Sequence, residues 1–139
     1  MPDVYGEAYY HLIWATARRE RMVVPRIEDL LYDYIRRKCR EKQAFVYALG
    51  GMPDHVHLAC SIPASLAVAE FAQTLKGSSS HYINHRGQLD GLRWQRGYSY
   101  LTFAKRDLLA VVAYIEGQKQ HHADGKLWPK LERLPTDED

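Results

Sequence analysis

Two kinds of hydrophobic periodicity alternate along this chain, and their order limits the folds that it can adopt. Short runs with a period of two, rich in aromatic and β-branched residues, predict strands. These runs cover residues 9–16, 44–49, 55–62 and 98–104. Longer stretches with apolar residues three or four apart predict helices over residues 27–42, 66–86 and 106–122. The predicted order is therefore strand, helix, strand, strand, helix, strand, helix.

The first six predicted elements have the order of a ferredoxin-like fold, which belongs to the α+β class. A chain of 139 residues can bury one substantial core and leaves little room for a second. We therefore expect one domain over residues 1–135, and a solvated acidic tail over residues 136–139. Because this scaffold carries many unrelated activities, the function has to be argued from individual residues.

His55, Val56 and His57 stand at the start of the third predicted strand. Side chains alternate between the two faces of a strand, so both histidines point the same way, about 7 Å apart, and Val56 points to the other face. Two neutral imidazoles on a rigid strand are a ready pair of metal ligands. The alternative is a pair of half-exposed strand residues with no chemical role.

The predicted C-terminal helix places Tyr114 and Gln118 on one face, because they are four residues apart. Tyr114 lies at the edge of an apolar stripe, so packing is the alternative to a chemical role. Gly117 stands between them, and a glycine inside a helix costs about 1 kcal/mol relative to alanine. We hypothesise that Gly117 loosens the helix so that Tyr114 can swing.

Five other histidines have simpler interpretations. His121 and His122 are expected to be solvated residues in the last turn of the C-terminal helix. His11 can neighbour the histidines of the third strand across the sheet, although packing is its expected role. His81 and His85 are four apart on a helix, which is a possible zinc spacing, but no further motif accompanies them.

These segments together resemble the HUH single-strand tyrosine transposases, which are the IS200-like transposases and their repeat-associated relatives. The letters stand for histidine, hydrophobic residue, histidine. The segments that carry the resemblance are residues 53–57, 114–118 and 121–122, with weaker similarity at residues 10–14, 74–79 and 94–98. Residues 100–105 are less similar. The resemblance implies a ferredoxin-like antiparallel sheet with helices on one face and an additional C-terminal helix that carries the nucleophile.

The resemblance also implies roles for individual residues. Tyr114 would be the nucleophile, and His55, His57 and Gln118 would be ligands of a divalent metal. Nitrogen ligands favour Mn²⁺, whereas cellular supply favours Mg²⁺, so both stay open. The implied activity is cleavage and rejoining of single-stranded DNA through a 5′-phosphotyrosine intermediate. The implied substrate carries hairpin ends, and the implied assembly is a homodimer in which Tyr114 acts with the histidines of either subunit.

Local clusters of basic, polar and aromatic residues are candidates for DNA contacts. The net charge of +2 does not itself indicate nucleic acid, so the argument depends on clustering. Phosphates are bound by cations and hydroxyl donors, and unpaired bases stack on aromatic rings. The candidate DNA-binding residues are Arg18, Arg19, Lys76, Ser78, Arg93 and Trp94. Runs of charge are also common on solvated faces.

Several patterns are missing from the sequence. Cys39 and Cys60 form neither a metal-site spacing nor a disulfide framework, which is typical of a reducing cytosol. There is no signal-peptide pattern and no apolar run long enough to span a membrane. There is also no Walker-type glycine loop, so no nucleotide cofactor is expected. The expected location is the cytoplasm.

Three alternatives to a transposase remain. A domesticated relative could process chromosomal repeat hairpins without mobilising itself. A non-catalytic module for RNA or DNA could use the same fold, although such modules carry exposed aromatics on their central strands. A metal hydrolase could use activated water, with Tyr114 as a structural residue. A covalent protein–DNA adduct would separate the last two from a transposase.

Overall fold

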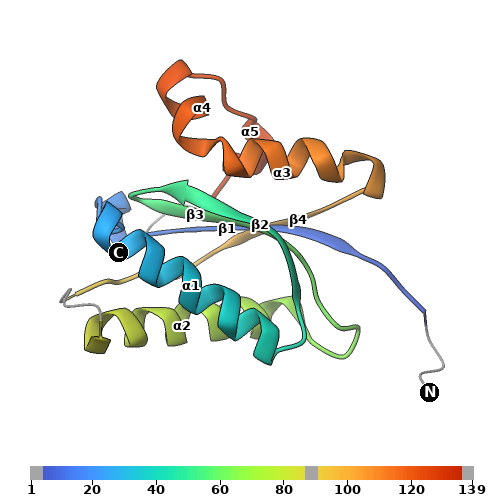
Figure 1. The fold of residues 1–139 in the computed structure, drawn as a ribbon, viewed down its shortest axis with the longest axis horizontal. Helices are drawn as coiled ribbons and strands as arrows, with labels where there is room; N and C mark the ends of the chain where they lie inside the picture. The colour runs from blue at the N-terminus through green and yellow to red at the C-terminus, as the bar shows by residue number, and fades with distance from the viewer. Residues whose placement is uncertain (1–4, 87–90, 136–139) are drawn as a thin grey trace.

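The computed structural model describes residues 5–86 and 91–135 and contains a four-stranded sheet (Figure 1). The strands are β1 (Tyr9–Ala15), β2 (Phe45–Met52), β3 (His55–Ser61) and β4 (Ser99–Phe103). Their order across the sheet is β2-β3-β1-β4, and all three pairings are antiparallel. This is the ferredoxin-like arrangement, so the predicted fold class is confirmed.

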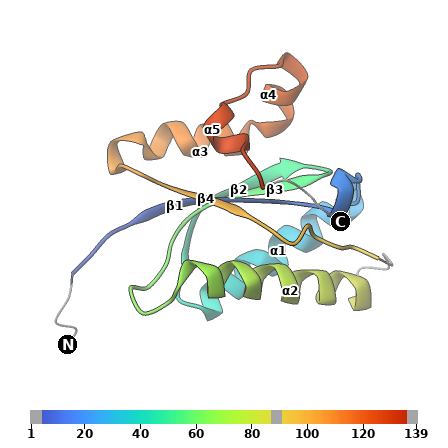
Figure 2. The ribbon, with the colours of Figure 1, turned by 180° about the vertical axis from the view of Figure 1, so that it is seen from behind.

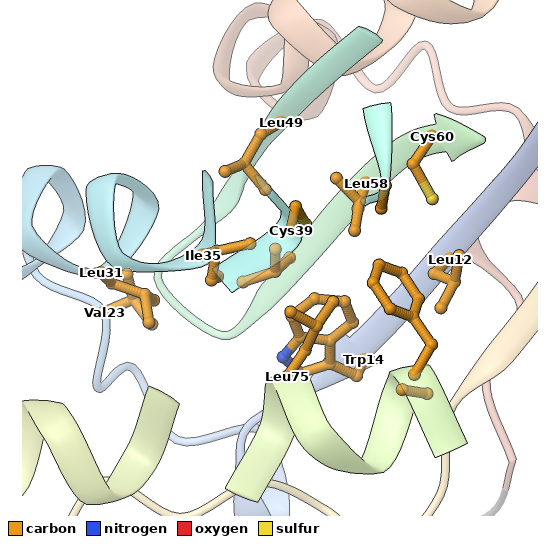
Figure 3. Close-up of a cluster of buried hydrophobic side chains, with 14 of the residues drawn as sticks. Leu12, Trp14, Val23, Leu31, Ile35, Cys39, Leu49, Leu58, Cys60 and Leu75 are labelled. Carbon is orange, nitrogen blue, oxygen red and sulfur yellow. The ribbon is translucent and has the colours of Figure 1, made fainter. Parts of the chain in front are cut away.

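Two long helices cover one face of the sheet and enclose the main core. They are α1 (Pro25–Glu41) and α2 (Val68–Arg86), which lie side by side below the sheet in Figures 1 and 2. Every fourth residue of α1 from Ile27 to Cys39 is buried, because residues at this spacing share one helix face. Leu12, Trp14 and Leu58 point from the strands into the same core (Figure 3).

Three shorter helices cover the opposite face. They are α3 (Leu108–Glu116), α4 (Gln118–Asp124) and α5 (Pro129–Glu132). Figure 2 shows α5 in front of the junction between α3 and α4, on the side of the sheet away from α1 and α2. At Gly50 of β2, an added Cβ would lie 2.5 Å from the backbone oxygen of Ile115, so glycine allows α3 to pack directly on the strand. Two short 3-10 turns, η1 (Ala17–Arg19) and η2 (Lys105–Asp107), precede α1 and α3.

The structure differs from the sequence prediction at three places. The helix predicted over residues 106–122 is interrupted at Gly117, whose φ of −97° and ψ of 20° end α3 and start α4. Gly50 and Gly51, which lie beyond the strand predicted over residues 44–49, extend β2 and pair with His57 and Val56. The short helix α5 was not predicted, because four residues are too few for a periodic pattern.

Other element ends agree with the prediction to within about two residues, which is the usual uncertainty at helix and strand ends. The predicted acidic tail at residues 136–139 lies outside the described residues. Within residues 5–86 and 91–135, no helix is both long and apolar enough to cross a membrane.

Candidate active site

Both histidines of β3 lie on the face of the sheet that α3, α4 and α5 cover. His57 pairs across the sheet with Ile13 of β1 and Gly50 of β2, and His55 pairs with Ala15 and Met52. The two rings are fully buried, and their centroids are 5.0 Å apart. The strand alternation therefore gives the common direction that the sequence predicted, but both side chains are buried rather than half-exposed.

The far side of the His55 ring is held by a carboxylate. Nδ1 of His55 lies 2.7 Å from Oδ1 of Asp54, and Nε of Arg19 donates to Oδ2 of Asp54 at 3.1 Å. Burial alone would raise the pKa of Asp54, but the hydrogen bond with His55 and the charges around it lower that pKa to about 2. An ionised Asp54 accepts a proton donated by Nδ1, and in the neutral ring this leaves the lone pair of Nε2 facing the site.

The far side of the His57 ring is held by a third histidine. Nδ1 of His57 lies 2.8 Å from Nε2 of His11 on β1. Burial, and then the neighbouring His57, lower the pKa of His11 to about 3, and burial also lowers the pKa of His57. When both rings are neutral, one proton lies between these two nitrogens. When Nδ1 of His57 donates it to His11, Nε2 of His57 carries no proton. Packing was the expected role of His11, with the histidines of the third strand as possible neighbours, and it does contact one of them, a predicted metal ligand.

Tyr114 of α3 and Gln118 of α4 contact this histidine pair from the helical layer that covers it. Oε1 of Gln118 lies 3.3 Å from Nε2 of His55, and the Tyr114 ring stands edge-on to the His57 ring with centroids 6.0 Å apart. Both side chains are almost completely buried. The four residues singled out as the site therefore come together, although α3 ends between Tyr114 and Gln118.

Glu132 of α5 also reaches the centre of this group, and nothing in the sequence predicted it. Its Oε1 lies 3.4 Å from Nε2 of His55, and its Oε2 lies 3.2 Å from Nε2 of His57. The hydroxyl of Tyr114 donates a short hydrogen bond to Oε2. Burial would raise the pKa of Glu132, but its hydrogen bonds and the surrounding imidazoles lower it to about 2, so the carboxylate is ionised.

His122 lies at the edge of the same group. Its Nε2 is 3.0 Å from Oε1 of Gln118 and 3.7 Å from Oε1 of Glu132. Its ring is partly buried against that of His55 and is not the freely solvated side chain that the sequence suggested. The sequence signal for His122 was its spacing of four from Gln118, which places both on one face of α4.

The Tyr114 phenol is enclosed by its neighbours. Its ring lies between the rings of His121, at 4.9 Å, and Trp128, at 4.8 Å, with interplanar angles of 24° and 22°. The backbone N–H of Trp128 donates to the phenolic oxygen at 3.1 Å. Burial and the hydrogen bond to Glu132 raise the pKa of Tyr114 to about 12. The phenol is therefore protonated at neutral pH and needs charge compensation before it can act as a nucleophile.

The donor atoms of this group suit a divalent cation. Ligand atoms from His55, His122 and Glu132 all lie within 4.8 Å of one another. Nε2 of His57 is buried and makes no hydrogen bond of good geometry within the described residues, although the Glu132 carboxylate lies close by. A buried nitrogen without a hydrogen bond carries a desolvation cost that a bound cation would remove. Imidazole nitrogens with amide and carboxylate oxygens fit Mn²⁺ and also Mg²⁺.

The same chain matches a known protein family over most of its length. A family model described as "Transposase IS200 like" matches residues 4–118. The chain belongs to the IS200-like transposase family. The match covers β1 through the first residue of α4, and it includes His55, His57, Tyr114 and Gln118. Glu132 and His122 lie beyond it.

Individual members of the family are similar in sequence and in fold. The ISDra2 transposase TnpA of Deinococcus radiodurans is 32% identical over 115 residues, which cover 78% of this chain and 82% of that protein. A crystal structure of a Deinococcus radiodurans R1 protein proposed to be a transposase has a TM-score of 0.68 and 28% identity, over 85% of this chain and 95% of that one. A REP-associated tyrosine transposase bound to a REP hairpin has the same fold, with a TM-score of 0.64, 16% identity, and coverage of 93% and 79%.

The predicted DNA-binding residues of this IS200-like transposase lie in two regions. Arg18 and Arg19 are exposed at η1, where Arg19 pairs with Asp54. Arg93 and Trp94 line a groove of about 600 Å³ together with Lys76. Arg93 is exposed, whereas Nε1 of Trp94 donates to Ser79.

Lys76 and Ser78 already have partners inside the protein. Nζ of Lys76 donates to the carbonyl oxygens of Gln95, Arg96 and Gly97 at 2.6, 3.0 and 2.9 Å. The hydroxyl of Ser78 donates to the carbonyl of Thr74 at 2.6 Å. Lys76 thus holds the segment before β4 against α2, and a phosphate contact would have to compete with these carbonyl groups.

Proposed function

We propose that this chain is a metal-dependent single-stranded DNA transposase that cleaves and rejoins DNA through a 5′-phosphotyrosine intermediate. The observation that supports the proposal best is the convergence of Tyr114 and Gln118 with His55 and His57 in one buried group. These residues come from opposite halves of the chain. In both histidines Nδ1 has a partner behind the ring, and Nε2 faces the group.

The proposed reaction uses Tyr114 as the nucleophile. Its phenolic oxygen attacks the phosphorus of a DNA phosphodiester, and the bond from phosphorus to the 3′ oxygen breaks. The 5′ phosphate becomes linked to Tyr114, the phenol loses its proton, and the departing oxygen gains one to become a 3′-hydroxyl. Attack by another 3′-hydroxyl reverses the step and joins two strands. The phosphodiester energy is kept in the covalent bond, so no nucleotide cofactor is consumed.

His55, His57 and Gln118 are the proposed ligands of the divalent cation. Asp54 and His11 hold the two imidazoles with their free nitrogens toward the site. When bound, Mg²⁺ or Mn²⁺ would stabilise the negative charge that develops on the phosphate oxygens. The phenol of Tyr114 lies beside the same group.

The proposed substrate is single-stranded DNA with hairpin ends. A relative of the same fold has been seen bound to a REP hairpin. On this chain, Arg93 and Trp94 offer a cation and a ring beside the groove above α2, and Arg18 and Arg19 offer further charge near His55. Lys76 and Ser78 remain candidates, but their internal hydrogen bonds favour a supporting role.

A homodimer is the proposed assembly. Each chain supplies one nucleophile, whereas excision of an element requires cleavage at two ends. β4 is an edge strand that exposes Tyr100 and Leu101, and an unpaired edge of this kind can pair with a second copy.

Covalent trapping tests the proposal. The full chain is incubated with Mn²⁺ and end-labelled single strands that contain the hairpins flanking its gene, and adducts are resolved under denaturing conditions. Wild type and the control Tyr5→Phe, at an exposed residue, should form a protein–DNA adduct. Tyr114→Phe should form none, and His57→Ala should lose at least 99% of the adduct.

Two other outcomes would reject the proposal. Cleavage by Tyr114→Phe without an adduct would favour a hydrolase that uses activated water. Binding of the hairpin by wild type with neither cleavage nor adduct, in Mn²⁺ and in Mg²⁺, would favour a non-catalytic nucleic-acid-binding module.

A further inference from the structure

The Glu132 carboxylate occupies the position between the histidine pair and the phenol. Its Oε1 lies 3.4 Å from Nε2 of His55, and its Oε2 lies 3.2 Å from Nε2 of His57. Oε2 also accepts a hydrogen bond from the hydroxyl of Tyr114. Only 15% of its side chain is exposed. The carboxylate therefore lies against the same two nitrogens that the proposed function assigns to a cation.

The spacing of these donor atoms is that of ligands sharing one ion. Neighbouring donors on an octahedral cation with bonds of about 2.1 Å are about 3 Å apart, and opposite donors are about 4.2 Å apart. Oε1 of Gln118 lies 3.3 Å from Nε2 of His55, and Oε1 of Glu132 lies 3.4 Å from the same nitrogen. His122 Nε2 is 3.7 Å from the carboxylate. All three separations lie between these two limits.

The hydrogen bonds behind the two rings point the same way. Nδ1 of His55 is held by Asp54 and Nδ1 of His57 is held by His11, so both Nε2 atoms face the site and, in the neutral rings, can bind a cation. The carboxylate oxygens and the amide oxygen of Gln118 present lone pairs as well. A divalent cation bound between these nitrogens and oxygens would be attracted to all of them at once.

We propose that Glu132 is a further protein ligand of this cation in the DNA-free protein, and that its second oxygen positions Tyr114 beside the ion. This inference depends on the proposed function, because it assigns a residue to the same metal centre. The position of Glu132 follows from α5, because Leu131 of this helix is buried and Trp128, the residue just before it, stacks on Tyr114. The hydrogen bond from Tyr114 to Glu132 must open before the phenol can reach a phosphate.

Metal affinity without DNA tests this assignment. Mn²⁺ binding to the full chain is measured by calorimetry, and free Mn²⁺ is counted independently by electron paramagnetic resonance. Glu132→Gln keeps the shape and the hydrogen-bond acceptor but removes the charge, and it should raise the Kd for Mn²⁺ at least tenfold. Glu132→Asp should recover part of the affinity. Glu70→Gln, an exposed carboxylate on α2, should leave the Kd unchanged.

A thermal melt of each variant with and without Mn²⁺ separates lost binding from lost folding. If the assignment is right, Mn²⁺ raises the Tm of Glu132→Gln less than that of wild type. Equal or tighter Mn²⁺ binding by Glu132→Gln would overturn the assignment and leave Glu132 as a hydrogen-bond partner of Tyr114. In that case, weak Mn²⁺ binding by His57→Ala would still support a metal centre at the histidine pair. If wild type binds no Mn²⁺, both the metal centre and the role of Glu132 fail.

Discussion

His55 and His57 differ in the group that fixes each ring. An ionised carboxylate, Asp54, holds His55, and a neutral imidazole, His11, holds His57. A carboxylate is a common partner for a metal-binding histidine, because it fixes the tautomer and makes the free nitrogen more basic. A second histidine fixes the tautomer through a hydrogen bond without adding charge. His57 is therefore the proposed ligand whose orientation depends on a single uncharged contact.

Replacing His11 tests this dependence. His11→Phe removes the acceptor and should weaken Mn²⁺ binding about tenfold, the lower end of the usual effect of such partners. It should also lower the free energy of unfolding by about 1–3 kcal/mol, since a buried donor on His57 loses its partner. His11→Gln retains an acceptor and should recover part of both. Calorimetry and urea denaturation measure the two effects, with His81→Phe as the surface control.

Unchanged Mn²⁺ binding in His11→Phe would contradict the positioning role. A loss of stability alone would then reduce His11 to the packing residue that the sequence suggested.

At the level of elements, the break between α3 and α4 places the phenol and the amide on separate helices. Tyr114 belongs to α3 and Gln118 begins α4, and Gly117 joins them. Lys119 of α4 is anchored by an ion pair of 2.7 Å with Glu28 of α1. An added Cβ at Gly117 would lie 3.2 Å from the Ala113 carbonyl oxygen and 3.2 Å from the His121 ring, which is tight but tolerable.

Gly117→Ala tests whether this break matters. Alanine favours helix by about 1 kcal/mol over glycine, so the substitution should favour continuation of α3 into α4 and restrict Tyr114. Adduct formation should fall about tenfold, while Mn²⁺ binding should change less than threefold. The measurement is the rate of adduct formation in the labelled single-strand assay, with Ala110→Gly on the exposed face of α3 as the control. An unchanged rate would remove the hypothesis that Gly117 allows Tyr114 to move.

The sequence predicted all four strands of the sheet and four of the residues that meet in the candidate site, His55, His57, Tyr114 and Gln118. Strand alternation at residues 55–57 and the spacing of four between Tyr114 and Gln118 are local rules, so they could be applied without coordinates. Bringing the two groups together required the resemblance to a family. Their chemical roles stay predictions.

Glu132 could not be predicted as a member of the site, and His11 could be named only as a possible neighbour of the histidine pair, because their positions depend on tertiary contacts. Glu132 reaches the site only after the chain reverses at Gly125, whose φ is 69°, and Trp128 stacks on Tyr114. The contact of His11 depends on the register in which β1 pairs with β3. Neither event leaves a periodic pattern in the sequence.

At the scale of the whole molecule, Tyr114 can act with the histidines of its own chain or with those of a second chain. In this structure Tyr114 lies against His57 and Glu132 of its own chain, so one subunit contains all the groups that the proposed reaction uses. A homodimer would then contain two complete sites, one for each end of an element.

Mixing two inactive variants tests this arrangement. Tyr114→Phe and His57→Ala are combined, allowed to exchange subunits, and assayed for adduct. If each phenol acts with its own histidines, no subunit is complete and activity should stay below 1% of wild type. Recovery to about a quarter of wild-type activity would show that Tyr114 acts with the partner's histidines. Light scattering on the mixture verifies that dimers are present.

The proposed function requires one phenol among ten tyrosines to become covalently linked to DNA. The most direct measurement is mass spectrometry of the protease-digested adduct, which identifies the modified tyrosine and the end of the DNA attached to it. The expected result is a 5′ phosphate on Tyr114. A DNA-linked peptide that contains a different tyrosine, or a linkage to the 3′ end of the strand, would contradict it.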